Sequence, residues 1–386
     1  MTAAPTLEWV EQEHSRSARW RSETGSAPPR RVRPVDDTLT ADAAFRLASE
    51  GTGLLWRGDF QNARQLLQAL SRRFDRKPRQ GAKPVPDEAP LASAAFHQHR
   101  MKQGQRARIL GLLLLELEGD YAIDLRRAPD LRLACSEAWG PATGERSVAS
   151  LRELLGLVGA HEWRRRGVEI PALGPAPNNR IHAHFGVFSP VRGEYIDLVA
   201  RAPLPSTTLA FDIGTGTGVL ASLLARRGVE RVVATEIDPR ALACARENIR
   251  RLGLQAQVEV LEVDLFPAGK APLLVCNPPW VPGRPSAPIE RAVYDEGSRM
   301  LRGFLAGLPA HLTQTGEGWL ILSDLAEHLG LRSRDELLHW IDSAGLVIVA
   351  HSQARPQHPK ATDPDDPLHA ARSREVTSLW RLALPR

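Results

Sequence analysis

Asn277-Pro278-Pro279-Trp280 is the segment best suited to chemistry on a nitrogen atom. The lone pair of an amide or aromatic amine nitrogen is delocalised, so this nitrogen is a poor nucleophile. Two acceptors for its hydrogens, the Asn277 side-chain oxygen and the Pro278 carbonyl, would localise the lone pair. The prolines fix φ and remove backbone donors, and Trp280 offers a flat face for stacking. The alternative is an ordinary proline-rich turn beside a buried tryptophan.

A glycine-rich turn lies upstream and is predicted to bind a cofactor. Residues 209–213 are typical of a strand, and Gly214, Thr215, Gly216, Thr217 and Gly218 follow before an apolar helix. Glycines let the backbone turn tightly and approach a ligand closely. The G-x-G-x-G spacing differs from the G-x-G-x-x-G of dinucleotide sites, but alone it does not identify the ligand.

Three acidic residues accompany this turn and narrow the choice of ligand. Glu236 ends the second strand, about 20 residues on, where a carboxylate accepts ribose hydroxyls in nucleotide-type sites. Asp264 ends the third strand and can accept a hydrogen bond from an adenine amine. Asp212 can meet a charged amino group, directly or through water. Asp212 and Asp264 could be turn or capping residues, but the order of the three acidic residues favours a cofactor that contains adenosine.

Together these segments resemble the class I S-adenosylmethionine (SAM)-dependent methyltransferases over about residues 180–386, within the group that carries NPP followed by Tyr, Phe or Trp. The resemblance implies a Rossmann-like α/β fold with a seven-stranded, mostly parallel sheet and helices on both faces. It also implies SAM as cofactor and in-line methyl transfer to nitrogen, with no metal. The implied cofactor-binding residues are Asp212, Gly214, Thr215, Gly216, Gly218, Glu236, Ile237, Asp264, Leu265 and Asn277, and the implied catalytic residues are Asn277, Pro278, Pro279 and Trp280.

Residues 234–242 and 245–248 are similar to a block in the release-factor glutamine methyltransferases and in rRNA and tRNA amine methyltransferases. Residues 186–190 resemble the segment that those enzymes place before the first strand, near the substrate. Phe188 and Pro190 are therefore expected to line the substrate pocket, with packing under the sheet as the alternative. The loop 281–296 departs from the family pattern. It is expected to form a lid that includes the substrate-binding residue Arg284, or else a surface connection.

Four functions remain open at this point. The first expectation is methylation of a protein glutamine amide, since the block above resembles the glutamine enzymes. Methylation of an RNA or DNA base amine is the alternative, because the net charge is +5 and the sequence pI is about 9.4. A solvated arginine-rich surface is the favoured explanation of that charge, because the sequence has no long basic run with interleaved aromatic residues. Methylation of a small molecule and a non-enzymatic SAM- or RNA-binding module are the remaining hypotheses.

Three regions are predicted along the chain. Residues 1–37 are polar and expected to be a disordered tail. Residues 38–173 are expected to form a mainly helical substrate-recognition domain, and residues 174–386 the methyltransferase domain. In the second region helices are predicted over residues 41–49 (capped by Thr40), from about 60 to 74, 91–118 and 148–165, short strands over 121–125 and 131–134, and a proline-rich linker over 76–90. In the third, strands are predicted over residues 209–213, 232–236, 258–263, 273–276, 319–323, 346–350 and 376–382, and helices over 219–227, 239–252, 300–312 and 334–344.

Composition excludes several other classes of protein. The cysteines, Cys135, Cys244 and Cys276, lie far apart, which argues against a zinc site or a disulfide framework. The apolar run at residues 109–115 is too short to cross a membrane. No secretory signal is recognised, and the sequence is expected to be cytoplasmic, with a protein or nucleic-acid substrate and without a membrane or metal partner.

Overall fold

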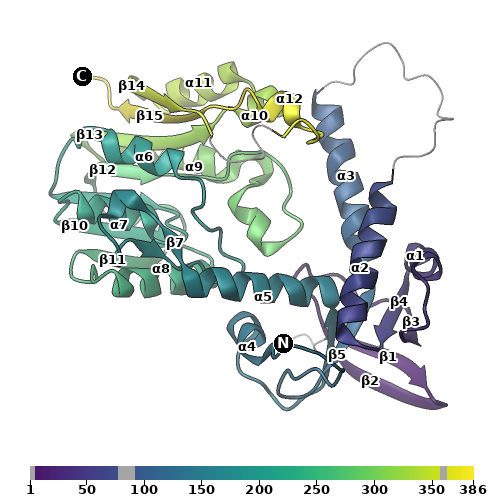
Figure 1. Ribbon diagram of the computed structural model, residues 1–386. Coiled ribbons are helices and arrows are strands. Elements are labelled where there is room, and N and C mark those ends of the chain that lie inside the picture. Colours follow the sequence, from purple (N-terminus) through teal and green to yellow (C-terminus); the bar gives the residue numbers. More distant parts are fainter. Residues whose placement is uncertain (1–4, 77–91, 357–362) are drawn as a thin grey trace, which may run out of the picture. The chain divides into compact units, whose positions relative to one another are not determined.

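The computed structural model describes residues 5–76, 92–356 and 363–386 of the chain (Figure 1). Two compact units are present. The N-terminal unit comprises Met1–Pro90 and His97–Glu162, and the C-terminal unit comprises Leu91–Phe96 and Trp163–Arg386. The C-terminal unit thus resumes at Trp163, whereas the methyltransferase domain was expected from residue 174. No helix among the described residues is long and apolar enough to cross a membrane.

The C-terminal unit is built on a seven-stranded sheet in the order β11-β10-β9-β12-β13-β15-β14. The five strands from β11 to β13 are parallel to their neighbours, and β15 runs antiparallel to both β13 and β14. The seven-stranded, mostly parallel sheet predicted from the sequence is confirmed. The strands are β9 (Leu209–Ile213), β10 (Arg231–Glu236), β11 (Val258–Glu262), β12 (Ala271–Cys276), β13 (Leu312–Ser323), β14 (Val347–Ala354) and β15 (Thr377–Ala383).

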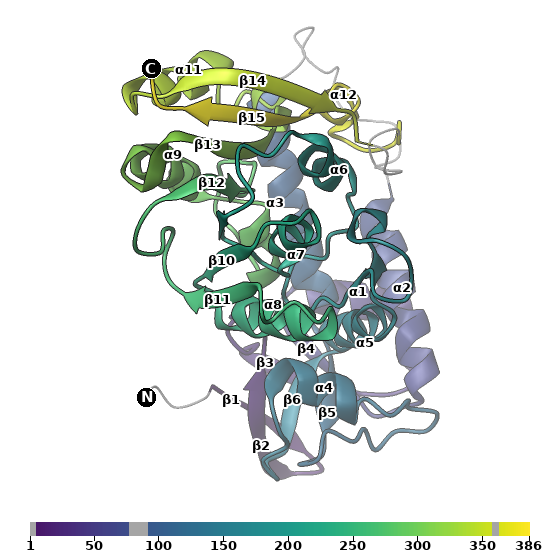
Figure 2. The same ribbon diagram turned by 90° about the vertical axis from the view of Figure 1, so that its left-hand side faces the viewer.

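Helices cover both faces of this sheet (Figure 2). Helices α6 (Glu194–Arg201), α7 (Val219–Arg226) and α8 (Pro239–Arg251) pack on one face, and α9 (Arg299–His311) and α11 (Arg334–Ser343) on the other. Side chains alternate along each strand, so neighbouring Ala210 and Phe211 enter opposite cores. Smaller elements complete the unit: β7 (Val168–Glu169), η1 (Pro171–Leu173), β8 (Arg180–Ile181), η2 (Pro288–Ala292), η3 (Glu296–Ser298), α10 (Leu325–His328) and α12 (His369–Arg372).

The N-terminal unit contains a six-stranded sheet in the order β1-β2-β6-β5-β4-β3. Its strands are β1 (Thr6–Glu11), β2 (His14–Arg21), β3 (Arg31–Val35), β4 (Thr52–Trp56), β5 (Leu113–Leu117) and β6 (Ser147–Ser150). The expected disordered tail is therefore wrong for the described residues after 4, which supply three of these strands. Leu7, Trp9, Ala18 and Trp20 alternate with polar residues and bury one face of the β1–β2 hairpin. This period of two outweighs the low apolar content on which the expectation of disorder depended.

The helices of this unit are α1 (Ala41–Ser49), α2 (Phe60–Asp75), α3 (Ala92–Leu110), α4 (Arg132–Trp139) and α5 (Leu151–Arg166). The Thr40 cap is confirmed, because its side chain accepts a hydrogen bond from Ala43 N. The expected helix over residues 91–118 ends at Leu110, and its last part is strand β5, which is buried in the sheet. The expected strand over residues 131–134 is wrong because it begins helix α4, and residues 121–125 form no strand. Apart from Arg76, the predicted linker lies outside the described residues.

Candidate active site

Three loops leave the sheet side by side at the carboxyl ends of β10, β9 and β12. Thr235 is aligned with Ile213, and Ile213 with Cys276, so these residues form one row across the three strands. The next residues in the chain are Glu236, Gly214 and Asn277. Ligands of open α/β sheets bind at this edge. The fold therefore brings the glycine-rich turn, a carboxylate and the NPPW segment to one place, as the sequence predicted.

The glycine-rich turn adopts a backbone that other residues rarely tolerate. Gly214, Gly216 and Gly218 have φ of 70°, 57° and 81°, in the left-handed region. Thr215 N donates to the Thr235 carbonyl oxygen at 2.9 Å, which ties the turn to β10. A Cβ atom on Gly214 would overlap the methyl group of Met300. The turn thus needs glycine for its conformation and for the close approach of α9.

Asp212 is buried on β9 directly below this turn, with 1% of its surface exposed. Its Oδ2 atom accepts hydrogen bonds from Thr215 Oγ1 at 2.5 Å and from Ala221 N at 2.9 Å. Burial raises the pKa of Asp212 to about 6, although these two hydrogen bonds act in the opposite direction. The carboxyl group is consequently ionised at neutral pH and becomes neutral as the pH falls below about 6.

Glu236 is held in a fixed orientation at the end of β10. Its Oε2 accepts a hydrogen bond from Gly216 N at 3.0 Å, and its Oε1 accepts from Ile237 N at 2.8 Å and Asp238 N at 2.9 Å. Burial raises the pKa of Glu236 against the effect of these backbone donors. Ile237 is 56% exposed, so an apolar side chain faces solvent beside an oriented carboxylate.

Asp264 and Leu265 lie just beyond the end of β11. Asp264 is exposed and forms an ion pair with Arg299, at 3.3 Å from Arg299 Nη1. Leu265 has φ of 60°, and its carbonyl accepts a hydrogen bond from Thr235 Oγ1 at 2.6 Å. Sequence reasoning gave no role to Arg299. The ion pair of Arg299 with Asp264 depends on the fold, which places the start of α9 beside the end of β11.

The NPPW segment follows β12 with Pro278 buried and Asn277 and Trp280 half-buried. Trp280 Nε1 donates a hydrogen bond to Asn277 Oδ1 at 2.8 Å. The guanidinium carbon of Arg192 lies over the Trp280 ring, 5.1 Å from its centroid. Burial raises the pKa of the preceding Cys276 thiol well above its usual value, so this thiol is not a nucleophile.

The segment before β9 carries Phe188 and Pro190, the two residues expected to line the substrate pocket. Phe188 is 37% exposed and Pro190 is buried. The neighbouring Val187 packs against Ala241 and Cys244 of α8. The residue of this segment that reaches the NPPW loop is Arg192, which sequence reasoning overlooked. The only sequence signal for this role was that Arg192 lies two residues after Pro190, in the segment expected near the substrate.

The loop 281–296, which carries Arg284, is anchored at its base and near its end. Val281 N donates to the Val293 carbonyl at 3.1 Å, and Asp295 N donates to the Val281 carbonyl at 3.0 Å. Arg291 forms an ion pair with Asp238 at 3.5 Å, two residues after Glu236. Asp295 accepts a hydrogen bond from Met300 N at 2.8 Å at the start of α9. The loop therefore extends to the cofactor side of the sheet edge.

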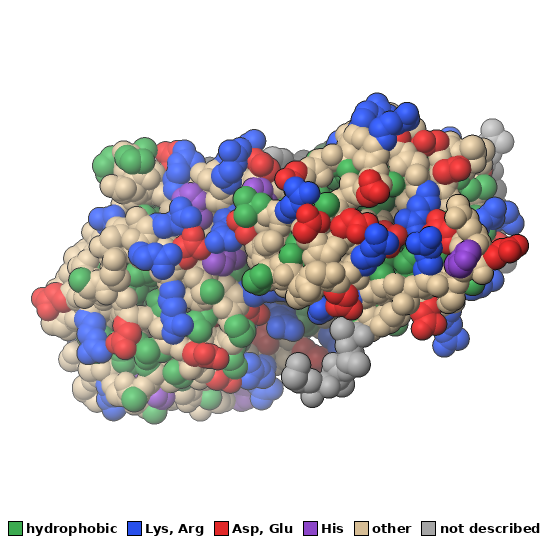
Figure 3. All heavy atoms as spheres, turned by 90° about the horizontal axis from the view of Figure 1, so that it is seen from below, with side chains coloured by type: hydrophobic (Ala, Val, Ile, Leu, Met, Phe, Trp, Pro, Cys, Tyr) green, Lys and Arg blue, Asp and Glu red, His purple; other side chains and the backbone are tan. Residues whose placement is uncertain are grey.

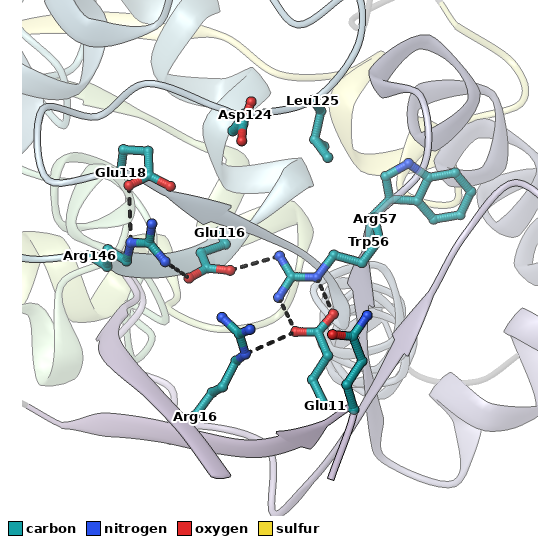
Figure 4. A pocket seen from close by; sticks show the side chains of 10 residues that line it. Glu11, Arg16, Trp56, Arg57, Glu116, Glu118, Asp124, Leu125 and Arg146 are labelled. Atoms are coloured by element: carbon teal, nitrogen blue, oxygen red, sulfur yellow. Dashed lines mark hydrogen bonds and ion pairs between the residues drawn. The ribbon is translucent and has the colours of Figure 1, made fainter. Parts of the chain in front are cut away.

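The N-terminal unit has a polar cavity of about 240 Å³ between β1, β2, β4 and β5 (Figure 4). Its arginines are matched by acids: Arg57 pairs with Glu11 at 2.6 Å and Glu116 at 2.7 Å, and Arg146 pairs with Glu118 at 3.0 Å. These contacts cross between strands and stabilise the sheet.

Among the described residues, no group of three or more His, Cys, Asp or Glu side chains is arranged to hold a metal ion.

Comparison with known proteins agrees with this geometry. The family model described as "Methyltransferase small domain" matches residues 178–328. The chain is 30% identical over 164 residues to the tRNA1(Val) (adenine(37)-N6)-methyltransferase of Aeromonas hydrophila, covering 41% of this chain and 70% of that protein. The chain belongs to the methyltransferase small-domain family. Residues 178–328 thus form a methyltransferase domain, and they include every residue predicted for the cofactor site.

Two release factor glutamine methyltransferases are also similar to this methyltransferase chain. The protein of Cereibacter sphaeroides is 29% identical over 173 residues, which cover 41% of this chain and 60% of that protein. The protein of Moorella thermoacetica is 42% identical over 117 residues, which cover 28% of this chain and 40% of that protein. The chain therefore spans less than two thirds of either relative.

Proposed function

We propose that this protein is a SAM-dependent methyltransferase that acts on a planar nitrogen, with a protein glutamine side-chain amide as the first candidate acceptor. The observation that carries the proposal is the aligned row of Thr235, Ile213 and Cys276. Because of this row, the glycine-rich turn and Asn277 leave adjacent strands, so a nitrogen held by Asn277 would face a group bound at the turn.

The residues at this edge fit SAM. The left-handed glycine turn leaves room for close backbone approach, and Glu236 presents an oriented carboxylate for ribose hydroxyls. Asp212, with its pKa raised to about 6, would present a carboxylate to the amino group of the methionine moiety at neutral pH. Asp264 and Leu265 would contact the adenine. When bound, SAM supplies an electrophilic methyl group.

The acceptor nitrogen would be held by Asn277 and Pro278. The Asn277 Oδ1 atom and the Pro278 carbonyl would accept the two hydrogens of the –NH2 group, which localises the nitrogen lone pair toward the methyl group. The NPPW segment keeps this geometry because Pro278 and Pro279 fix the backbone between Asn277 and Trp280. Phe188, Pro190, Trp280 and Arg284 are the residues proposed to lie near the acceptor.

A glutamine acceptor is supported by similarity to the two release factor glutamine methyltransferases. Figure 3 shows basic and acidic side chains interspersed over the face that it draws. The second candidate is a base amine in RNA. It is favoured by similarity to the adenine methyltransferase of A. hydrophila, because the match covers 70% of that protein's length.

The test uses tritiated SAM with lysate from a host strain that lacks the gene. Wild type, Asn277→Ala and the matched control Asn62→Ala are incubated, and the products are treated with protease or nuclease. Asn62 lies in the N-terminal unit and contacts Asp37, so its loss should leave transfer unchanged. We expect protease-sensitive label that Asn277→Ala reduces on the order of 100-fold, the effect of removing one preorganised hydrogen-bonding group.

Peptide mapping of the label, with a purified release factor as a defined acceptor, would then locate methylglutamine. Label that nuclease removes would replace the glutamine acceptor with a base amine. Transfer by Asn277→Ala at the wild-type rate would refute the proposed role of the NPPW segment.

A further inference from the structure

Trp280 makes a contact that a stacking platform does not require. Its Nε1 atom donates to Asn277 Oδ1 at 2.8 Å, so the aromatic residue of the NPPW segment touches the atom proposed to hold the acceptor nitrogen. We propose that Trp280 is a positioning residue, whose indole N–H sets the orientation of the Asn277 amide. This inference rests on the proposed function.

The argument begins with the polarity of the two groups. An asparagine side chain carries an acceptor oxygen and a donor –NH2 on the same planar amide, whereas an indole N–H only donates. A rotation of the Asn277 amide by 180° would bring its –NH2 group against the indole N–H, donor against donor. The indole therefore selects the rotamer in which Oδ1 points toward Trp280.

This selection leaves Asn277 able to accept from a substrate. A carboxamide oxygen has two lone pairs, so Oδ1 can accept from Trp280 and from the acceptor –NH2 together. In the flipped rotamer Asn277 would present its own –NH2 to the substrate –NH2, and the lone pair of the acceptor nitrogen would not be localised. Trp280 thus acts on the reaction through Asn277.

Trp280 is itself held firmly enough for this role. Its ring packs against the apolar clusters on both faces of the sheet and against a third cluster that contains Phe96, Val281 and Leu329. Its carbonyl oxygen lies 3.5 Å from Nη1 of Arg332, which is 3% exposed. Backbone and ring are therefore both fixed by surrounding groups.

Arg192 covers one face of the ring and is fixed in turn. Its Nε and Nη2 atoms donate to Glu194 and Glu375, each at 3.0 Å. Glu375 is 3% exposed and also accepts a hydrogen bond from Ser323 Oγ at 2.7 Å. A base or amide could not stack on the face of the ring that Arg192 occupies.

The first test separates the ring from its N–H group. Trp280→Phe keeps an aromatic ring and removes the donor. Trp340→Phe is the matched control, because Trp340 is also half-buried beneath an arginine, with the Arg302 guanidinium carbon 5.5 Å from its ring centroid. Initial rates of transfer from tritiated SAM to lysate macromolecules are measured over a series of SAM concentrations.

We expect Trp280→Phe to lower the apparent kcat about ten-fold, the effect of losing one hydrogen bond, with an unchanged KM for SAM. Trp340→Phe should behave as wild type. A Trp280→Phe protein with the wild-type kcat would overturn the positioning role and leave the proposed function standing. Wild-type protein that methylates no nitrogen would overturn the proposed function itself.

The second test does not depend on activity. Nuclear magnetic resonance of protein labelled with ¹⁵N-tryptophan gives an indole N–H signal for each of the nine tryptophans. The Trp280 signal is identified as the one missing from Trp280→Phe. We expect this signal to shift in Asn277→Ala, because its acceptor is gone, while the Trp340 signal stays in place. An unchanged Trp280 signal would refute the hydrogen bond and the inference with it.

Discussion

Replacement of Gly214 by alanine tests whether the glycine-rich turn and helix α9 are fitted to each other. Gly214 has φ of 70°, and a Cβ atom there would overlap the Met300 methyl group. Alanine at this position should therefore lower the free energy of unfolding in two ways. A residue with a Cβ atom is strained in the left-handed backbone conformation, and the Met300 side chain must be displaced. The displaced side chain would also disturb the cofactor side of the turn.

The two costs can be estimated separately. A left-handed backbone costs a non-glycine residue roughly 1–2 kcal/mol. Gly345 supplies a matched control, since its φ is 69° and nothing lies within 4 Å of the Cβ position. Gly345→Ala should therefore show the backbone cost alone. Met300 ends in a flexible thioether that can move, so we expect its displacement to add about 1 kcal/mol.

Thermal unfolding and SAM binding by calorimetry are the measurements. At roughly 2–4 °C per kcal/mol, Gly345→Ala should lower the Tm by about 2–8 °C, and Gly214→Ala by a few degrees more. Gly214→Ala should bind SAM at least ten-fold more weakly, and Gly345→Ala should bind it normally. In the background of Met300→Ala, the additional effect of Gly214→Ala on Tm should disappear.

The reasoning would be refuted if Gly214→Ala had the Tm of Gly345→Ala and bound SAM as wild type does. It would also fail if the Met300→Ala background left the effect of Gly214→Ala on Tm undiminished. Either result would mean that the close approach of Met300 to the turn does not constrain this position.

Two further predictions concern ionisation. Because burial raises the pKa of Asp212 to about 6, calorimetry should show SAM binding weakened roughly four-fold between about pH 7.5 and 5.5, as the carboxylate becomes neutral; Asp212→Asn should bind weakly with little pH dependence. In the N-terminal unit, hydrogen bonds from Arg127 and Arg126 hold the pKa of Asp59 well below its usual 3.8. This stabilisation is complete above about pH 4 and is lost as the pH falls through the folded pKa. Asp59→Asn should therefore lower the Tm at neutral pH, and the difference from wild type should narrow in acid; a constant difference across pH would contradict this.

The C-terminal fold could be predicted closely because its signals are local. Each parallel strand is a short apolar run followed by turn residues, so residues 209–213 were predicted with both ends correct. Asp238 and Pro239 mark the start of α8, and the cap is formed by the Asp238 side chain. The site at the carboxyl ends of the strands followed from the same alternation.

The N-terminal sheet could not be predicted in the same way. Its strands come from distant parts of the chain, with β2 paired to β6 about 130 residues later. Strand β5 lies directly after α3, so the apolar residues 113–117 continue the apolar end of that helix and the sequence pattern does not separate the two elements. The polar composition of residues 1–37 predicts disorder, whereas the period-two pattern that includes Trp9 and Trp20 indicates strands.

The sequence also did not predict which side chains contact one another in the site. The hydrogen bond from Trp280 to Asn277 depends on the rotamers of both side chains. The contact of Arg192 with the Trp280 ring joins segments that lie more than 80 residues apart in the chain (280 − 192 = 88). The types of these residues give no indication of such pairs. The sequence therefore predicted which residues meet at the sheet edge, and packing decided what each one contacts there.

The chain enters the C-terminal unit twice, first with residues 91–96 and again with residues 163–386. Phe96 supplies a buried side chain to the cluster with Val281 and Leu329, and its ring lies 6.3 Å from that of Tyr294. A protease cut or a gene division near residue 163 would therefore not release an intact catalytic half. A fragment that begins there would lack Phe96 and with it one of the buried side chains of the cluster against which Trp280 packs.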